Sequence, residues 1–428
     1  MISITFIWIL FGLIGIGVPI VFALGLAPIA GFMMADRSAF LALLAQKLYL
    51  GIDQFPLVAI PLFILAGEIM NVGGITERLV RLANVLVGHF RAGLAHVNIL
   101  ASIFFAGLSG SAVADTSALG SMLIPAMEKQ GYTRRFAAAV TAASSVIGPI
   151  IPPSIIMVIY AYIMQVSVGG LFLAGFVPGL LTGLGLMLMT ALIANRRNLP
   201  EARKRASVAE VGSSFGAAFL PLLTPIIILG GILGGVFTPT EAAGVAVVYA
   251  LFLSLLVLRT MSIRDLPLLL LRTGLSSAII LLAVGTAGIF GWAATMSGAP
   301  SQLATLVRSI STDPYVVLLA VNVLLLIVGM FLDAGPAILI LGPILGPAMA
   351  QLGVDPLHFA IVMCVNLTIG LATPPMGLVL FVASTVSRER IEHIAREMLP
   401  YYMVHLGIIA LVTYVPAISL TVPRYFGF

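Results

Sequence analysis

The chain contains the stretch LIPAMEKQGYTRRFAAAVTAASSVIGPIIPP at residues 123–153 and a second version of it, LGPAMAQLGVDPLHFAIVMCVNLTIGLATPP, at residues 345–375. The two align without a gap at an offset of 222 residues (345 minus 123), and 11 of their 31 positions are identical. The identities include Gly148 with Gly370 and the proline pairs that follow them. Duplicated apolar segments that carry helix breakers at matching positions are typical of membrane transport folds built from two repeats.

The composition indicates a membrane protein with many spans. Hydrophobic residues make up 61% of the chain, charged residues 9%, and the mean hydropathy is +1.17. The net charge of +5 comes from basic residues spread through short loops, which argues against nucleic acid as a partner and for membrane lipid. The single cysteine, Cys364, excludes a disulfide, and no basic residue precedes Arg37, so we expect no cleavable signal peptide.

Basic residues differ between corresponding loops of the two halves. The loop 128–135 carries Lys129, Arg134 and Arg135, whereas its counterpart 350–357 carries no Lys or Arg. Because Lys and Arg accumulate in cytoplasmic loops, the two halves are predicted to have opposite orientations. This topology leaves four of the 21 basic residues outside: Arg37, Lys47, Arg308 and Arg424. We therefore predict an all-α polytopic fold with an inverted repeat.

The predicted organisation has six parts. They are the first-repeat scaffold helices and amphipathic arm (1–92), the first-repeat transport half (93–169), a connecting helix with a basic cytoplasmic linker (170–212), the second-repeat scaffold helices and arm (213–313), the second-repeat transport half (314–387) and a C-terminal helix (388–428). Helices are expected near 2–17, 19–36, 56–70, 170–194, 213–235, 239–258, 273–296 and 398–420, with arms at 77–91 and 301–311.

Two apolar stretches have lengths that do not suit simple spans. The 35 residues from Gly93 to Met127 would extend about 52 Å as one helix, against a hydrocarbon core of about 30 Å. The sequence Gly-Leu-Ser-Gly-Ser at 107–111 interrupts this stretch, which predicts a re-entrant hairpin over 93–127. A second hairpin is predicted over 314–351. Each hairpin precedes a span that a proline pair interrupts, and this predicts broken helices at 136–165 and 357–386.

The breaks predict a binding site. Irregular backbone at membrane depth is tolerated only where it lines a cavity or is buried in protein. Carbonyl groups at such breaks are ligands for a small cation, and helix N-termini attract an anion, so sodium and a carboxylate fit both. The candidates are Ser109, Gly110, Ser111, Ser144, Gly148 and Pro152 for a first sodium site, and Gly329, Asp333, Asn366, Gly370, Thr373 and Met376 for a second. Ser111, Pro153, Ser154, Asp333, Thr373 and Pro375 are the candidates for substrate binding.

Other interpretations of these residues remain open. Ser109 and its neighbours alternatively serve close helix packing, as small residues do in membrane bundles. Residues 107–110 also match the Gly-x-Ser-Gly pattern of intramembrane serine proteases, but a nucleophilic serine needs a positioned base, and no histidine is expected beside Ser109. Asp115 is expected either to serve the site or to cap the second limb of the hairpin. Glu68 and Glu241 either face the bundle interior or, for Glu241, lie at a helix N-terminus.

Four motifs resemble the large membrane subunit of tripartite ATP-independent periplasmic (TRAP) transporters, and the resemblance covers essentially the whole chain. They are GLSGSAVADT at 107–116, GPIIPPS at 148–154, TPTEAAG at 238–244 and GLATPPM at 370–376.

The resemblance implies sodium-driven uptake of an organic acid, such as a C4-dicarboxylate, sialic acid or another sugar acid. It implies Na⁺ as the coupling ion, with no organic cofactor and no enzymatic activity. Implied partners are a periplasmic solute-binding protein and a small four-helix membrane subunit on a separate chain, in a bacterial inner membrane. An elevator motion of the hairpins and broken helices is implied as well. The alternative is a stand-alone sodium-coupled carboxylate transporter that works without a binding protein.

Overall fold

The computed structural model describes residues 5–197, 199–200, 205–299, 301–302, 305, 311 and 313–428. Within these ranges every regular element is a helix. Seven of the described helices, some together with a flanking turn, are long and apolar enough to cross a membrane, and a bent pair near the C-terminus raises the number to eight. The prediction of an all-α polytopic membrane protein is confirmed.

The helices vary widely in length because many of them end at glycine or proline. They are α1 (Thr5–Gly15), α2 (Ile20–Met34), α3 (Leu41–Ile52), α4 (Ala59–Val72), α5 (Ile75–Val87), α6 (Gly93–Ser109), α7 (Ala112–Lys129), α8 (Arg134–Ser145), α9 (Ile155–Met164), α10 (Val168–Arg197), α11 (Val208–Leu233), α12 (Pro239–Leu251), α13 (Leu266–Ser297), α15 (Pro314–Phe331), α16 (Ala334–Gln351), α17 (Pro356–Gly370), α18 (Leu378–Ser387), α19 (Ile391–Glu397), α20 (Leu399–Tyr414) and α21 (Ala417–Tyr425). Short 3₁₀ turns lie at Ser38–Phe40, Phe55–Val58 and Ile263–Asp265, and a π-helical turn at Phe252–Val257 continues α12.

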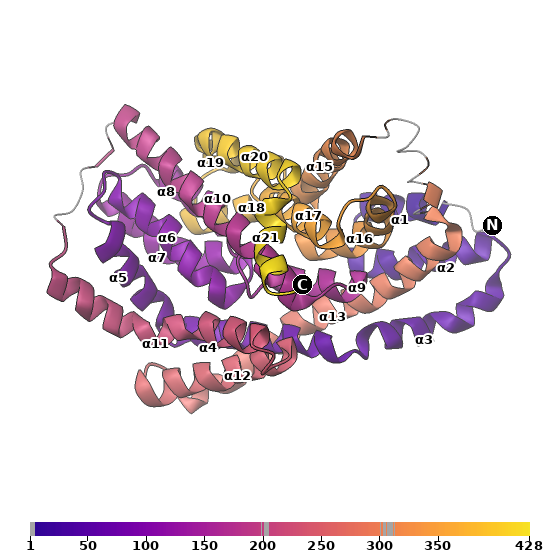
Figure 1. Cartoon of the computed structure of the whole chain (residues 1–428), viewed down its shortest axis with the longest axis horizontal. Coiled ribbons are helices and arrows are strands. Elements are labelled where there is room, and N and C mark those ends of the chain that lie inside the picture. Colours follow the sequence, from indigo (N-terminus) through magenta and orange to yellow (C-terminus); the bar gives the residue numbers. More distant parts are fainter. Residues whose placement is uncertain are drawn as a thin grey trace.

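The helices form two groups that pack mainly within themselves. In the peripheral group, α12 packs on α4, α13 packs on α2, α3 and α4, and α11 packs on α5 and α12. In the central group, α7 packs on α8 and α18, α15 packs on α17, and α10 packs on α6, α20 and α21. The two groups meet mainly where α5 contacts α6 and where α13 contacts α16. Figure 1 shows α3, α4, α11, α12 and α13 along one edge of the molecule, with the central group beside them.

The helices are interrupted at glycine or proline or within two residues of one. Gly110 and Ser111 separate α6 from α7, and Leu332 and Asp333 separate α15 from α16. Nine residues, 146–154, separate α8 from α9, and seven residues, 371–377, separate α17 from α18. Both of these longer interruptions contain a proline pair, and a proline has no N–H to continue the hydrogen-bond ladder of a helix.

Several elements differ from those predicted, and α11 begins at Val208 instead of residue 213. Helix α3 was not predicted, because its 12 residues are too short for a span and Lys47 interrupts the apolar run. Helix α13 begins at Leu266 instead of residue 273, since the exposed Arg272 is tolerated near a helix end, where a long side chain reaches water. The predicted helix at 398–420 is two helices, α20 and α21, bent by 57°; Pro416 at the bend has no N–H to continue the hydrogen-bond ladder.

Two predicted features fall largely or partly on residues outside the described ranges. The second amphipathic arm at 301–311 is one of them. The basic linker that follows α10 is the other.

Candidate functional site

The tip of the first hairpin packs directly on the first helix break. Gly110 adopts a left-handed conformation with φ of 59°, and a Cβ at this position would lie 2.6 Å from the carbonyl oxygen of Pro153. The Ser111 side chain caps α7 by accepting a hydrogen bond from the backbone N–H of Ala114 at 3.4 Å. A residue without a side chain is therefore required where the hairpin turns against the backbone of Pro153 and Ser154.

A buried carboxyl group lies behind this tip. The Ser109 hydroxyl donates a hydrogen bond to Asp115 Oδ1, and the Ser111 N–H donates to Ser109 Oγ at 3.3 Å. The other carboxyl oxygen, Asp115 Oδ2, is fully buried and has no hydrogen-bond partner in the described part of the chain. It lies against Gly148, at the start of the break. Asp115 does not cap α7, the second limb of the hairpin, because Ser111 takes that position. The Asp115 carboxyl group instead bonds to Ser109 at the hairpin tip.

The remaining residues of the predicted first sodium site divide into two sets. The carbonyl oxygen of Pro152 lies 3.9 Å from the position that a Cβ on Gly107 would occupy, so it faces the hairpin. Ser144 lies deeper: its hydroxyl accepts from Ser102 Oγ at 2.9 Å and lies 3.4 Å from Asn98 Oδ1. The structure thus brings Ser109, Gly110, Ser111, Gly148 and Pro152 around the tip, whereas Ser144 joins α6 to α8.

The second hairpin meets the second break in a similar way. Asp333 caps α16 by accepting a hydrogen bond from the Ala334 N–H at 2.7 Å. Farther down the hairpin, a Cβ on Gly370 would lie 2.6 Å from the Cα of Gly329, so these two backbones touch. One turn before Gly370, the amide nitrogen of Asn366 donates to Asn322 Oδ1 at 2.9 Å, while Asn366 Oδ1 is buried without a partner among the described residues.

The last residues of the second predicted site follow the break. Thr373 donates its hydroxyl proton to the Ile369 carbonyl at 2.9 Å. Met376 is 49% exposed and Pro375 is exposed as well. Ser154, predicted to bind substrate, is buried and caps α9 by accepting from the Met157 N–H at 3.4 Å.

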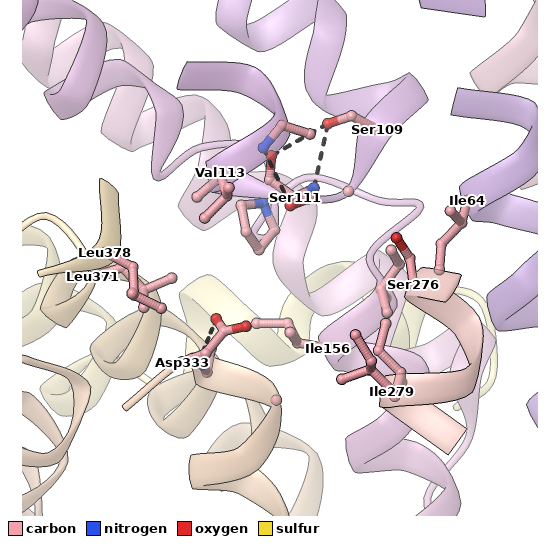
Figure 2. Close-up of a pocket in the computed structure, with 18 of the residues that line it drawn as sticks. Ile64, Ser109, Ser111, Val113, Ile156, Ser276, Ile279, Asp333, Leu371 and Leu378 are labelled. Carbon is pink, nitrogen blue, oxygen red and sulfur yellow. Dashed lines mark hydrogen bonds between the residues drawn. The ribbon is translucent and has the colours of Figure 1, made fainter. Parts of the chain in front are cut away.

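A cavity of about 580 Å³ separates the two hairpin tips. Of the predicted site residues, Ser109, Gly110, Ser111 and Asp333 line it, and the others do not. Figure 2 shows Ser109 and Ser111 on one side of this space and Asp333 across from them, with its carboxyl group directed into the cavity. The predicted substrate residues Pro153, Ser154, Thr373 and Pro375 are not among the lining residues.

The wall of the cavity facing the tips comes from the peripheral group, which the predicted site omitted. Glu68 and Asn71 of α4, Ser276 of α13 and apolar residues of α2, α4 and α13 line it. The lone acid in the apolar segment of α4 was a signal for this wall, whereas Ser276 had none. Glu241, in contrast, is exposed and forms a capping box with Thr238, so it serves a helix N-terminus.

No side-chain base is bonded to Ser109 in the described structure apart from the Asp115 carboxyl group. All five histidines are described, and the hydrogen bonds of His358 and His405 go to Ser419, Thr413 and Ala143. Among the described residues, Ser109 therefore has no histidine beside it to act as the base of a serine nucleophile. The polar atoms at the hairpin tips are hydroxyl, carboxyl and carbonyl oxygens, which are suitable ligands for a hard cation.

Comparison with known proteins places these features in a family. Residues 7–418 match the family model of the tripartite ATP-independent periplasmic transporter, DctM component. The chain is 41% identical over 429 residues to the sialic acid TRAP transporter large permease protein SiaM of Vibrio cholerae, covering 100% of this chain and 99% of that one. It is 43% identical over 384 residues to the C4-dicarboxylate TRAP transporter large permease protein DctM of Pseudomonas aeruginosa, covering 90% of each.

A solved structure shares the fold at low sequence identity. The YdaH transporter of Alcanivorax borkumensis matches with a TM-score of 0.64 and 18% identity, over 96% of this chain and 97% of that one. The named relatives are transport permeases, which confirms the expectation that this chain is not an enzyme. The chain belongs to the DctM component family, the large permease subunits of tripartite ATP-independent periplasmic transporters.

Proposed function

We propose that this chain is the large membrane subunit of a sodium-driven importer of an organic acid. The substrates named for two relatives, sialic acid and a C4-dicarboxylate, are both carboxylates, and this supports an organic acid here. The cavity between the hairpin tips has a volume of about 580 Å³, which is within the range of small-molecule sites.

The observation that carries the sodium assignment is a pair of buried oxygens without donors. Asp115 Oδ2 lies in the first half and Asn366 Oδ1 in the second, and each lacks a partner among the described residues. A buried polar atom that loses water without gaining a partner is costly, so each position favours a ligand that supplies positive charge. We assign Asp115, with Ser109, Gly110, Ser111, Gly148 and Pro152, to a first sodium site. Asn366, with Gly329, Asp333, Gly370, Thr373 and Met376, forms the second.

The packing supports an elevator motion of the central group against the peripheral group. Several ion pairs join elements of the central group to one another, as in Arg135 with Glu397 at 3.3 Å and Arg424 with Asp355 at 3.5 Å. The cavity lies between the two groups, and its lining comes from both. We propose that α6–α10 and α15–α21 carry sodium and substrate, and that α1–α5 and α11–α13 form the scaffold. The two halves are related as inverted repeats.

The scaffold has the surface that lipid and a small membrane subunit require. In the membrane-crossing windows of α11 and α13, only 22% and 33% of the residues are buried within this chain. The exposed apolar side chains of these helices must be covered by lipid or by another membrane protein. We propose a separate small subunit on this surface, a periplasmic binding protein that delivers the substrate, and an inner-membrane location.

Uptake by proteoliposomes tests this proposal. The chain is reconstituted with its small subunit, and accumulation of sialic acid or succinate is measured with and without an inward sodium gradient and a cognate binding protein. Accumulation that requires both is the expected result. Accumulation without the binding protein supports the alternative, a stand-alone sodium-coupled carboxylate transporter, and equal accumulation with a potassium gradient overturns sodium coupling.

A further inference from the structure

Glu68 is a carboxylate on the scaffold side of the cavity that the sodium sites do not use. It lies on α4, within the apolar window Phe55–Val72, and it lines the cavity together with Asn71, one helical turn farther on. No residue in the described ranges forms a hydrogen bond or ion pair with its side chain. Ionisable side chains inside membrane-spanning helices are costly and are retained mainly for function.

Glu68 lies beside the tip of the first hairpin. A Cβ on the preceding residue, Gly67, would lie 3.2 Å from the Leu108 carbonyl oxygen and 3.6 Å from the Cα of Ser109. Helix α4 therefore contacts the hairpin at the level of Ser109, and Glu68 faces the cavity immediately next to this contact. An anion bound between the hairpin tips therefore lies in the same cavity as the Glu68 carboxylate.

The charge of the cavity makes Glu68 consequential. Its described lining contains two ionisable side chains, Glu68 and Asp333, and neither Lys, Arg nor His. Asp333 caps α16 through the Ala334 N–H, and in the proposed function a sodium ion lies beside it. Glu68 has no such partner, so its negative charge acts on whatever else enters the cavity.

The position of Glu68 along α4 determines the side of the membrane on which it acts. Helix α4 ends at Val72 and leads into α5, which carries Arg78 and Arg81. Basic residues mark the cytoplasmic side, so Glu68 lies in the cytoplasmic half of α4. An anion leaving toward the cytoplasm passes the part of the scaffold wall that carries this charge.

We propose that Glu68 is a release-promoting residue: its scaffold carboxylate lowers the affinity of the cytoplasm-facing cavity for the organic acid. This inference rests on the proposed function. Because the scaffold stays in place in an elevator, the repulsion acts only when the carrier is on the cytoplasmic side. Like charges roughly 8 Å apart, at an effective dielectric constant of about 40, lower the affinity by a factor of about 5.

The electrostatic effect of Glu68 on the cavity can be tested without sodium or substrate. Ser276→Cys on α13 places a reporter thiol on the cavity wall, and the natural Cys364 is fully buried, so the chain without the reporter measures the background. Modification rates are measured with anionic sulfonatoethyl methanethiosulfonate and cationic trimethylammonioethyl methanethiosulfonate. Glu68→Gln should raise the anionic-to-cationic rate ratio by about 25-fold, since at a similar distance each rate changes by a factor of about 5 and the two change in opposite directions.

Two controls separate charge from shape. Glu68→Asp keeps the charge, and Glu392→Gln removes an exposed carboxylate on α19; each should leave the ratio within about 2-fold of its starting value. An unchanged ratio in Glu68→Gln overturns the proposal, and so does an equal rise in Glu392→Gln. If Glu68→Gln does not yield folded protein, a fall in the ratio on introducing Asn71→Asp, one turn away, supports the same field, and no change refutes it.

Uptake gives the second readout. In proteoliposomes, Glu68→Gln should lower both the KM for the transported acid and the maximal rate, because release becomes slower as binding tightens. A raised KM with an unchanged maximal rate contradicts a role in release. Failure of sodium coupling would appear in the unsubstituted protein, so it is distinguishable from failure of this inference.

Discussion

Replacing Gly110 by alanine tests whether the hairpin tip is built to fit the helix break. The new Cβ would lie 2.6 Å from the Pro153 carbonyl oxygen and 3.3 Å from both the Ile155 nitrogen and the Ser154 Cα. These three atoms belong to the backbone of the break, so no side-chain rotation relieves the overlap. The residue also has φ of 59°, a conformation in which alanine is disfavoured.

The two costs can be added to give an expected magnitude. Left-handed backbone costs a non-glycine residue about 1–2 kcal/mol. Forcing an extra methyl group into a packed site costs about 1–3 kcal/mol. Gly110→Ala should therefore destabilise the hairpin by about 2–5 kcal/mol, which is enough to move the tip away from Pro153 and disrupt the first sodium site.

The matched control is Gly407→Ala in α20. Gly407 is helical and exposed, and a Cβ there meets no atom within 4 Å. Alanine stabilises a helix interior by about 0.5–1 kcal/mol relative to glycine, so this variant should melt at or slightly above the parent temperature in detergent. Gly110→Ala should melt several degrees lower and lose sodium-dependent uptake. A Gly110→Ala protein with parent-like melting and uptake would refute the packing argument.

Two further predictions concern stability away from the cavity. Thr238→Ala removes the capping box that Thr238 forms with Glu241 at the start of α12. The loss of this cap should cost about 1 kcal/mol of stability, which would appear as a small drop in melting temperature with uptake preserved. A loss of uptake at unchanged stability would contradict a purely capping role. Glu397→Gln removes the ion pairs with Arg135 and Arg197, whose guanidinium-bearing side chains are 52% and 47% exposed. Because these arginines are half solvated, the loss should be about 1 kcal/mol or less and should shrink in high salt, and a salt-independent loss of several kcal/mol would disprove this assignment.

The helix breaks could be predicted from the sequence because their cause is local. Glycine and proline restrict or free the backbone only locally, so Gly110 and the proline pair at 152–153 predict the interruptions without reference to the rest of the chain. The oxygen-bearing residues at the tips follow from the same positions. The sequence therefore predicts Asp333 and Ser111 as site residues, and both line the cavity.

The rest of the site depends on tertiary contacts that have no local signal. Nothing in the sequence around Ser276 distinguishes it from other serines in apolar helices, and its place in the cavity wall results from how α13 packs on α4. Ser111, rather than Asp115, caps α7 because it directly precedes the first helical residue, Ala112, and the sequence does not mark at which of these residues the helix begins. The sequence does not predict α3, because this helix is too short for a hydropathy signal and packs on α13 through tertiary contacts.

Sodium-specific stabilisation tests the central claim of two cation sites at the helix breaks most directly. Melting temperatures of the purified protein, with its small subunit where the two copurify, are compared in sodium, potassium and choline at equal ionic strength. A ligand present at 100 times its Kd and bound only to the folded state adds about 2.7 kcal/mol. The account predicts a higher melting temperature in sodium alone, reduced in Asp333→Ala. Equal melting temperatures in all three cations would contradict it.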